Sequence, residues 1–269
     1  MQRISVAGAD IPAIGLGTWP MKGEECREAV ETALDLGYRH LDSAQMYGNE
    51  AAVGDAIDAS TVDREEIFLV TKVRRGHLQR DSLLETTGES RDRLGTTIDM
   101  LLIHSPSRSV PVAESIGAMN DLQAEGVVDH IGVSNFSVEQ LQEAMDASST
   151  PIVTNQVEYH PLKSQATLLD FCVENEVMVT AYSPLAKGRV IGNETLEEIG
   201  KPYGKTGAQV ALRWLIQQPF VSAIPKASSR RHQGDNIDIF DFELSDDEMA
   251  RIFDLQGGLV TRLRNTLGL

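Results

Sequence analysis

Short apolar runs alternate, along almost the whole chain, with longer segments in which apolar residues recur at helical spacing. The runs predict strands at residues 14–17, 40–43, 67–72, 98–104, 130–134, 152–156, 178–182 and 221–225. The longer segments predict helices at 24–36, 49–59, 81–94, 111–126, 137–147, 164–175, 193–217 and after residue 228. Strands that read as continuous apolar runs are typical of a parallel sheet buried on both faces. Eight strand–helix units within about 250 residues therefore predict an α/β protein of the (β/α)8 type, a TIM barrel.

Two further elements are expected outside the eight repeated units. The residues from Ser5 to Pro12 predict a small N-terminal hairpin. Ser245, with Glu248 three residues later, predicts a capping box and a short extra C-terminal helix. Asn49 is expected to act as the N-cap of the helix at 49–59.

No linker, low-complexity tract or shift in composition interrupts the chain, so we expect one domain over residues 1–269.

The chain is strongly acidic, with a formal net charge of −16 and an isoelectric point of about 4.7. This charge argues against a nucleic-acid partner, because nucleic-acid binding depends on basic patches. Only seven of the 24 basic residues are lysines. An acidic, lysine-poor surface suits a halophilic host, and a mildly acidic protein of an ordinary host is the alternative.

The sequence also bears on compartment and redox state. No run approaches the roughly 20 apolar residues that a membrane span needs. The first residues lack the apolar segment of a secretory signal, so we expect a cytoplasmic protein. Cys26 and Cys172 lie far apart in helix-like patterns and are expected to be free thiols.

The carboxyl ends of the predicted strands carry the chemistry-bearing residues, and in this kind of barrel those ends form the active site. Lys72 ends an apolar run, and a lysine is seldom buried without a partner. Asp42, one strand earlier, is its expected partner. His104 ends the most apolar strand, and Tyr47 lies on the loop beyond Asp42. For a lone histidine elsewhere, such as His40, a structural role is the simpler interpretation.

These four residues predict a specific reaction. An ammonium group beside a tyrosine favours the phenolate and lowers the tyrosine pKa, so we expect Lys72 to activate Tyr47 as an acid. Asp42 would hold Lys72, and His104 would donate a hydrogen bond to a substrate oxygen. Such a site polarises a carbonyl group while hydride comes from elsewhere. No side chain delivers hydride, so a nicotinamide cofactor is implied.

The chain resembles the aldo-keto reductase superfamily, especially its compact microbial or archaeal members that are similar to 2,5-diketo-gluconate reductase. The resemblance covers essentially the whole length and rests on ordered motifs: Gly15-Leu-Gly-Thr-Trp19, His40-Leu-Asp-Ser-Ala-Gln-Met-Tyr-Gly-Asn-Glu50, Leu69-Val-Thr-Lys72, Leu101-Leu-Ile-His104, Ile131-Gly-Val-Ser-Asn-Phe136, Asn155-Gln156, Tyr182-Ser-Pro-Leu185 and Ile224-Pro-Lys226. It implies NADP-dependent reduction of aldehydes and ketones, with a catalytic tetrad of Asp42, Tyr47, Lys72 and His104 and with Tyr47 as proton donor.

The resemblance also implies the binding residues. The nicotinamide would be held by Ser134, Asn135 and Gln156, with Tyr182 stacked on its ring. The pyrophosphate would meet Ser183, Pro184 and Leu185, and the adenosine end would meet residues 226–236. The full set of expected cofactor contacts is Thr18, Asp42, Ser134, Asn135, Gln156, Tyr182, Ser183, Pro184, Leu185, Lys226, Ser228, Ser229, His232, Asp235 and Asn236. The expected substrate contacts are Trp19, Tyr47, Arg74, His104 and Ser105, and no metal is expected.

The chain departs from the family pattern at the rim of the site. Ser105 and Arg74 stand where aromatic residues are common, so bulky or carboxylate-bearing carbonyl compounds are expected substrates. The alternative is that Arg74 merely pairs with a surface acid. His232 replaces an arginine, and Ala227 replaces a serine, in the adenosine segment. Histidine lacks the fork of an arginine, so we expect NADPH to be preferred and NADH to be usable.

Three other classes of protein fit the sequence less well. Gly15 and Gly17 do not complete the GxGxxG pattern of a Rossmann fold. A metal-dependent hydrolase on the same barrel would need converging histidines, and no His-x-His pair occurs. A redox-sensing regulator that binds NADP(H) with little turnover would look similar, but the intact tetrad favours an enzyme. We therefore expect a small-molecule carbonyl substrate, no nucleic acid, no membrane and a monomer.

Overall fold

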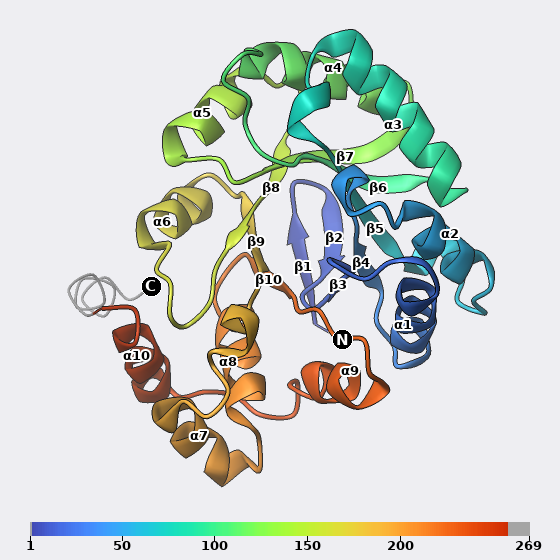
Figure 1. The fold of residues 1–269 in the computed structure, drawn as a ribbon. Helices are drawn as coiled ribbons and strands as arrows, with labels where there is room; N and C mark the ends of the chain where they lie inside the picture. The colour runs from blue at the N-terminus through green and yellow to red at the C-terminus, as the bar shows by residue number, and fades with distance from the viewer. Residues whose placement is uncertain (1, 258–269) are drawn as a thin grey trace.

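The computed structural model describes residues 2–257, and it begins with the expected hairpin. Strands β1 (Arg3–Val6) and β2 (Ala9–Pro12) pair in antiparallel fashion. Figure 1 shows this hairpin in the centre of the ring of helices. Its apolar side chains pack on residues inside the barrel, including Phe68, Met100 and Met178. The hairpin therefore closes one end of the barrel, and the cavity described below opens at the other.

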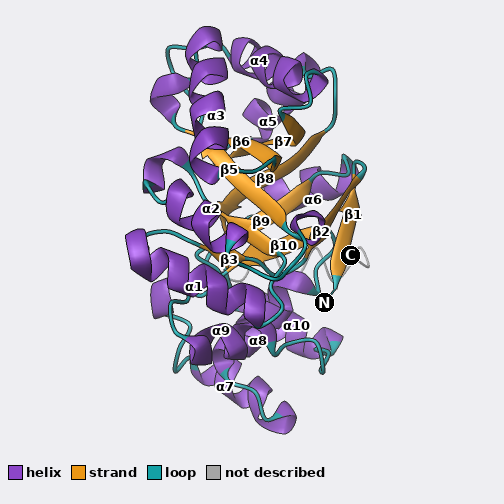
Figure 2. Cartoon of the chain, turned by 90° about the vertical axis from the view of Figure 1, so that its right-hand side faces the viewer, coloured by secondary structure: helices purple, strands orange, loops and turns teal. Residues whose placement is uncertain are grey.

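The eight remaining strands form the predicted parallel barrel, in the order in which they occur along the chain. They are β3 (Leu16–Gly17), β4 (His40–Asp42), β5 (Phe68–Val73), β6 (Ile98–Ile103), β7 (Val128–Ser134), β8 (Ile152–Glu158), β9 (Met178–Tyr182) and β10 (Val221–Ile224). The first and last strands meet through Ile14 and Ala223, where Gly15 N donates to Ala223 O over 2.9 Å. These contacts close the barrel, whose strands are seen from the side in Figure 2.

Helices surround the strands on the outside (Figures 1 and 2). They are α1 (Gly23–Asp35), α2 (Glu50–Asp58), α3 (Arg80–Leu94), α4 (Val112–Ala124), α5 (Val138–Ala147), α6 (Ala166–Glu174), α7 (Glu194–Gly200), α8 (Gly207–Ile216), α9 (Arg230–Ile237) and α10 (Asp246–Asp254). The apolar faces of helices and strands form one extended core. Burial of such surface, worth about 25 cal/mol per Å², is the main force that holds the two layers together.

One predicted helix, at 193–217, is wrong, because the structure divides it into α7 and α8. A short 3₁₀ turn at Lys201–Tyr203 contains Pro202, and Gly204 then adopts a left-handed φ of 67°. Thr206 begins α8 with a capping box. The turn brings Lys205 O so close to residue 200 that only glycine fits there, since a Cβ atom at Gly200 would lie 2.2 Å from that oxygen. Apolar periodicity continues on both sides of the break, which is why it suggested one helix.

The predicted capping box of the extra helix is confirmed, since Ser245 Oγ accepts from Glu248 N in α10. Asn49 does precede α2, but its side chain makes no capping hydrogen bond, so that part of the expectation is wrong. Cys26 and Cys172 are free and buried, and burial raises the pKa of Cys26 to about 11 and that of Cys172 to about 12. No helix within residues 2–257 is both long and apolar enough to cross a membrane.

Candidate active site

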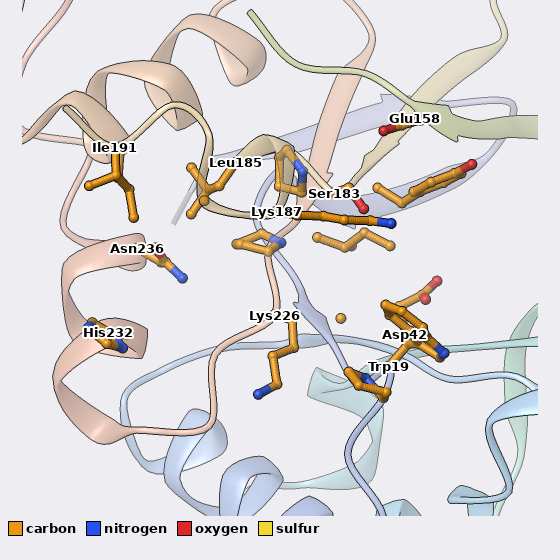
Figure 3. A pocket seen from close by; sticks show the side chains of 18 of the residues that line it. Trp19, Asp42, Glu158, Ser183, Leu185, Lys187, Ile191, Lys226, His232 and Asn236 are labelled. Atoms are coloured by element: carbon orange, nitrogen blue, oxygen red, sulfur yellow. The ribbon is translucent and has the colours of Figure 1, made fainter. Parts of the chain in front are cut away.

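A cavity of about 840 Å³ opens at the carboxyl ends of the barrel strands. It is lined by residues that end or follow seven of the eight strands, namely Gly17, Asp42, His104, Ser134, Glu158, Tyr182 and Ile224. Figure 3 shows Trp19 and Asp42 near one end, and His232 and Asn236 toward the other. The volume falls in the range of about 300–1,000 Å³ that ligand pockets have.

Asp42 and Lys72 form a buried ion pair on adjacent strands at the base of this cavity. Lys72 Nζ lies 2.5 Å from Asp42 Oδ1 and also donates to Ser43 O over 2.8 Å. The Lys72 side chain is completely buried. Burial by itself would lower the pKa of Lys72, but Asp42 and Tyr47 outweigh burial and raise it. Lys72 therefore stays an ammonium group, as the sequence predicted for a buried lysine with a partner.

Tyr47 lies next to this pair, on a 3₁₀ turn at Gln45–Tyr47, and lines the cavity as Asp42 does. Lys72 Nζ is 3.4 Å from the Tyr47 hydroxyl and 5.0 Å from the ring centroid. Burial raises the pKa of Tyr47, and this exceeds the lowering by Lys72. The expectation of a lowered pKa is thus wrong for the free protein, because the sequence does not show how deeply the phenol is buried. Tyr47 carries its proton over the whole neutral range.

His104 packs against Tyr47, with the ring centroids 5.6 Å apart in an edge-to-face arrangement. Burial, assisted by the charge of Lys72 and opposed by Asp42, lowers the pKa of His104 to about 4. The imidazole is therefore neutral at ordinary pH. Its buried Nδ1 atom has no hydrogen-bond partner within the described part of the chain, which favours the tautomer with the proton on Nε2.

A group of amides and hydroxyls extends from the tetrad along the ends of β7, β8 and β9. Gln156 Nε2 donates to Asp42 Oδ2 over 2.7 Å, so Gln156 and Lys72 hold both oxygens of that carboxylate. Asn135 Nδ2 donates to His104 O, and Tyr182 OH donates to Asn135 Oδ1, each over 3.0 Å. Asn135 has a left-handed φ of 61°. The structure thus brings together the residues that were expected to meet a nicotinamide.

The far end of the cavity is formed by the loops after β9 and β10. Ser183 and Lys187 have left-handed φ angles, and such backbone strain is most common at functional sites. Lys226 lies on the other side of the cavity (Figure 3), and its Nζ donates to Ser228 Oγ over 3.2 Å. Ser229 begins α9 as its N-cap, and its side chain accepts from His232 N. Exposed backbone N–H groups at such a helix start favour an anion.

The expected site residues do not all reach the cavity wall. The predicted residues that line it are Trp19, Asp42, Tyr47, His104, Ser134, Asn135, Tyr182, Ser183, Pro184, Leu185, Lys226, His232, Asp235 and Asn236. Lys72, Gln156 and Thr18 lie behind this wall and contact Asp42. Ser228 and Ser229 lie beside it, and Ser105 is half-buried outside it. Arg74 is exposed, and its guanidinium contacts His77.

Some lining residues were missed by sequence reasoning. They are Pro20, Met46, Glu158, Lys187, Gly188, Ile191, Glu197, Thr206, Ala208, Gln209 and Pro225, together with Gly17 and Ile224 from the strands. The exposed large hydrophobic side chains of the described residues are Trp19, Met46 and Ile191, and all three line the cavity. Two of the missed residues could have been expected from their places in the sequence, because Met46 precedes Tyr47 and Lys187 lies on the same loop as Ser183.

The aldo/keto reductase family model matches residues 13–256, which span the barrel and its cavity. The chain belongs to the aldo/keto reductase family. A solved structure described as a 2,5-diketo-D-gluconic acid reductase B is 44% identical, with a TM-score of 0.94 over 97% of this chain and 93% of that one. The 9,11-endoperoxide prostaglandin H2 reductase of Trypanosoma cruzi is 39% identical over 250 residues, 91% of this chain and 88% of the relative.

A third relative has been solved with its cofactor bound. Gox0644, solved as a variant in complex with NADPH, is 35% identical with a TM-score of 0.88, over 96% of this chain and 94% of that one. Aldo/keto reductases are oxidoreductases that use nicotinamide cofactors on small carbonyl compounds. No three histidine, cysteine or carboxylate side chains gather into a metal site in the described part of the chain.

Proposed function

We propose that this aldo/keto reductase reduces aldehydes and ketones to alcohols with NADPH, and that Tyr47 supplies the proton. The observation that carries the proposal is the buried Asp42–Lys72 pair with Lys72 Nζ 3.4 Å from the Tyr47 hydroxyl. Tyr47 and Asp42 both line the cavity, and the Tyr47 ring packs against His104. A protonated phenol, a fixed cation and a neutral imidazole are together suited to carbonyl reduction.

The roles follow from the charge states. Tyr47 donates its proton to the carbonyl oxygen, and His104 donates a hydrogen bond from Nε2 to the same oxygen. Lys72 stabilises the phenolate that remains, and its attraction to a negative oxygen is strong because the pair lies out of water. Asp42 keeps Lys72 charged and in place. Removal of one partner of such a buried pair lowers the free energy of unfolding by about 3–5 kcal/mol. The folded protein therefore holds both charged groups in place before the substrate binds.

The cavity fits a nicotinamide dinucleotide, which supplies hydride when it is bound. Asn135, Ser134 and Tyr182 form a polar group beside the tetrad where a carboxamide would be held. Lys226, Arg231 and Lys187 line the cavity of a protein whose net charge is −16, which favours phosphate groups there. Because His232 offers neither a permanent charge nor a bidentate fork, we propose that NADPH is preferred and NADH is also used.

We propose that the substrate lies against Trp19, Tyr47, His104 and the missed residue Met46. Trp19 and Met46 are 52% and 61% exposed, so they present apolar surface to a ligand at the cavity mouth. Arg74 contacts His77 and does not line the cavity, and Ser105 also lies outside the wall. The geometry therefore favours carbonyl compounds with an apolar or aromatic body over carboxylate-bearing ones.

The test is NADPH oxidation at 340 nm with a panel of aldehydes and ketones, together with identification of the alcohol product. Pairs of aldehydes that differ only in a carboxylate group would test the substrate class. We expect turnover with aromatic aldehydes and higher kcat/KM for the neutral member of each pair. Tight NADPH binding without turnover on any member of the panel would contradict the proposal and would favour the redox-sensing alternative.

A further inference from the structure

Asn49 holds a network of hydrogen bonds that a helix cap would not make. Its side chain is 2% exposed. Nδ2 donates to Thr18 Oγ1 and Met21 O, each over 3.0 Å, and lies 3.4 Å from Thr18 O. Oδ1 accepts from Ser43 Oγ over 2.7 Å. Every bond of the amide therefore goes to residues outside α2, the helix that Asn49 precedes.

The acceptors of Asn49 stand on either side of Trp19. Thr18 and Met21 are the two ends of a turn closed by Met21 N donating to Thr18 O over 2.8 Å. Both ends are buried, at 0% and 1% exposure, whereas Trp19 between them is 52% exposed and lines the cavity. The two ends of the turn are thus buried and held by hydrogen bonds, and the Trp19 ring projects from the turn into the cavity wall. Asn49 provides the side-chain hydrogen bonds that hold the turn.

The same network reaches the buried ion pair. Thr18 Oγ1 donates to Asp42 O over 2.8 Å, and Lys72 Nζ donates to Ser43 O over 2.8 Å. Together with the Lys72–Asp42 contact, these bonds form a closed ring that passes through Asn49. A fully satisfied buried network of this kind fixes the relative positions of its members. The Trp19 turn and the strand end that carries Asp42 are therefore linked through one amide.

We propose that Asn49 is a positioning residue that fixes the Trp19 wall relative to the Asp42–Lys72 pair and so determines the binding of substrates large enough to touch Trp19. This inference rests on the proposed carbonyl reductase function. Asn49 bonds directly to both ends of the Trp19 turn, whereas it reaches the Asp42–Lys72 pair only through an intermediate residue, Thr18 or Ser43. Its removal therefore acts on the KM of such substrates more than on cofactor binding.

The kinetic test is a double-mutant cycle of Asn49→Ala and Trp19→Ala. Asn49→Ala should raise KM for an aromatic aldehyde about tenfold, while KM for propanal and the Kd for NADPH change less than about twofold. In the Trp19→Ala background the Asn49 substitution should have almost no further effect on KM, because residues that act as a unit are not additive. Additive effects in the cycle, or an unchanged KM, would overturn the proposal.

A second measurement needs no activity. The chain has two tryptophans, and Trp214 is completely buried, so acrylamide quenching of fluorescence mainly reports Trp19. Asn49→Ala should change the quenching constant, and the change should vanish in the Trp19→Phe background. Asn49→Asp keeps the acceptor for Ser43 and removes the donors to the Trp19 turn, so it should act like alanine. It also provides a second variant if the alanine protein folds poorly.

The matched control is Asn120→Ala. Asn120 Nδ2 donates to Ser148 Oγ and Thr150 Oγ1 over 3.1 and 3.0 Å, and these residues do not line the cavity. This variant should lose stability with unchanged KM and unchanged quenching. If it shifts KM as Asn49→Ala does, the effect is general loosening and the proposal is wrong. Absence of turnover in the wild type would refute the reductase function, while the quenching comparison would still decide the role of Asn49.

Discussion

Single side chains at the base of the cavity owe their charge states to burial and to one ion pair. Burial lowers the pKa of Lys72, but Asp42 and Tyr47 together outweigh it, so Lys72 keeps its proton. Tyr47 keeps its proton because burial outweighs Lys72, and His104 loses its proton because burial and Lys72 act together. These states match the roles of fixed cation, acid and neutral hydrogen-bond donor. None of the three groups changes its charge in the neutral range.

The pH profile of carbonyl reduction tests these charge states. The pKa of His104 is about 4, below the usual 6.5, so this group stays neutral above about pH 5. The raised pKa values of Tyr47 and Lys72 keep both groups protonated beyond about pH 9. We therefore expect kcat/KM for reduction to be flat from about pH 5 to pH 9. An inflection near pH 6.5 that disappears in His104→Gln would contradict the assignment of a neutral imidazole.

Packing between neighbouring helices gives a prediction at the scale of elements. Gly54 in α2 and Gly88 in α3 are both within helices, but a Cβ at Gly54 would lie 2.3 Å from Leu94 O, whereas Gly88 has open space. Gly54→Ala should lower the free energy of unfolding by about 1–3 kcal/mol. Gly88→Ala, the matched control, should raise it by about 0.5–1 kcal/mol. Urea unfolding measures both, and equal effects would show that α2 and α3 do not pack as described.

The start of α9 gives a second prediction, which concerns cofactor choice. His232 lines the cavity near Lys226, and an arginine there would add a permanent charge and a fork for a 2′-phosphate. His232→Arg should raise the ratio of kcat/KM for NADPH to that for NADH about tenfold, equal to 1.4 kcal/mol. Arg230→Gln is the control, because Arg230 pairs with Asp35 and does not line the cavity. An unchanged ratio in His232→Arg would show that this position does not meet the phosphate.

The elements themselves were largely predictable from the sequence. Apolar runs mark the strands, and strand ends of a parallel barrel converge, so the sequence alone places Asp42, Lys72 and His104 together. The boundary between α7 and α8 could not be read from periodicity, which continues across Pro202 and Gly204. Asn49 shows the same limit, since a local capping pattern cannot reveal that its amide is taken by Thr18 and Met21.

The loops were the least predictable part of the site. Met46, Lys187 and Ile191 come from segments without periodicity, so Met46 and Lys187 are marked in the sequence only by adjacency to expected site residues, and the folded chain adds Ile191. The pKa of Tyr47 also lay beyond the sequence, because its sign depends on burial. From the sequence, Arg74 was expected to meet either a carboxylate of the substrate or an acidic residue on the surface. In the structure its guanidinium contacts His77 instead. The residue types of the site indicate which chemistry is possible, whereas the conformations of the loops determine which contacts those residues make.

The charge of the whole molecule gives a prediction about salt. A chain with a net charge of −16 repels itself, and salt screens that repulsion over a Debye length that shrinks from about 10 Å at 0.1 M to about 3 Å at 1 M. We expect Tm to rise between dilute buffer and molar KCl, as the hypothesis of a halophilic host requires. A Tm that is flat or falls over this range would count against the hypothesis.

The central claim is that Tyr47 gives its proton to the carbonyl oxygen, and Tyr47→Phe tests it most directly because only the hydroxyl is lost. Tyr203→Phe is the control, since that hydroxyl bonds Glu248 away from the cavity. The measurement is kcat for an aromatic aldehyde with saturating NADPH, alongside the Kd for NADPH. We predict a loss of at least about 100-fold in kcat for Tyr47→Phe, with Kd nearly unchanged and with Tyr203→Phe like the wild type. Retention of most of kcat in Tyr47→Phe would contradict the account.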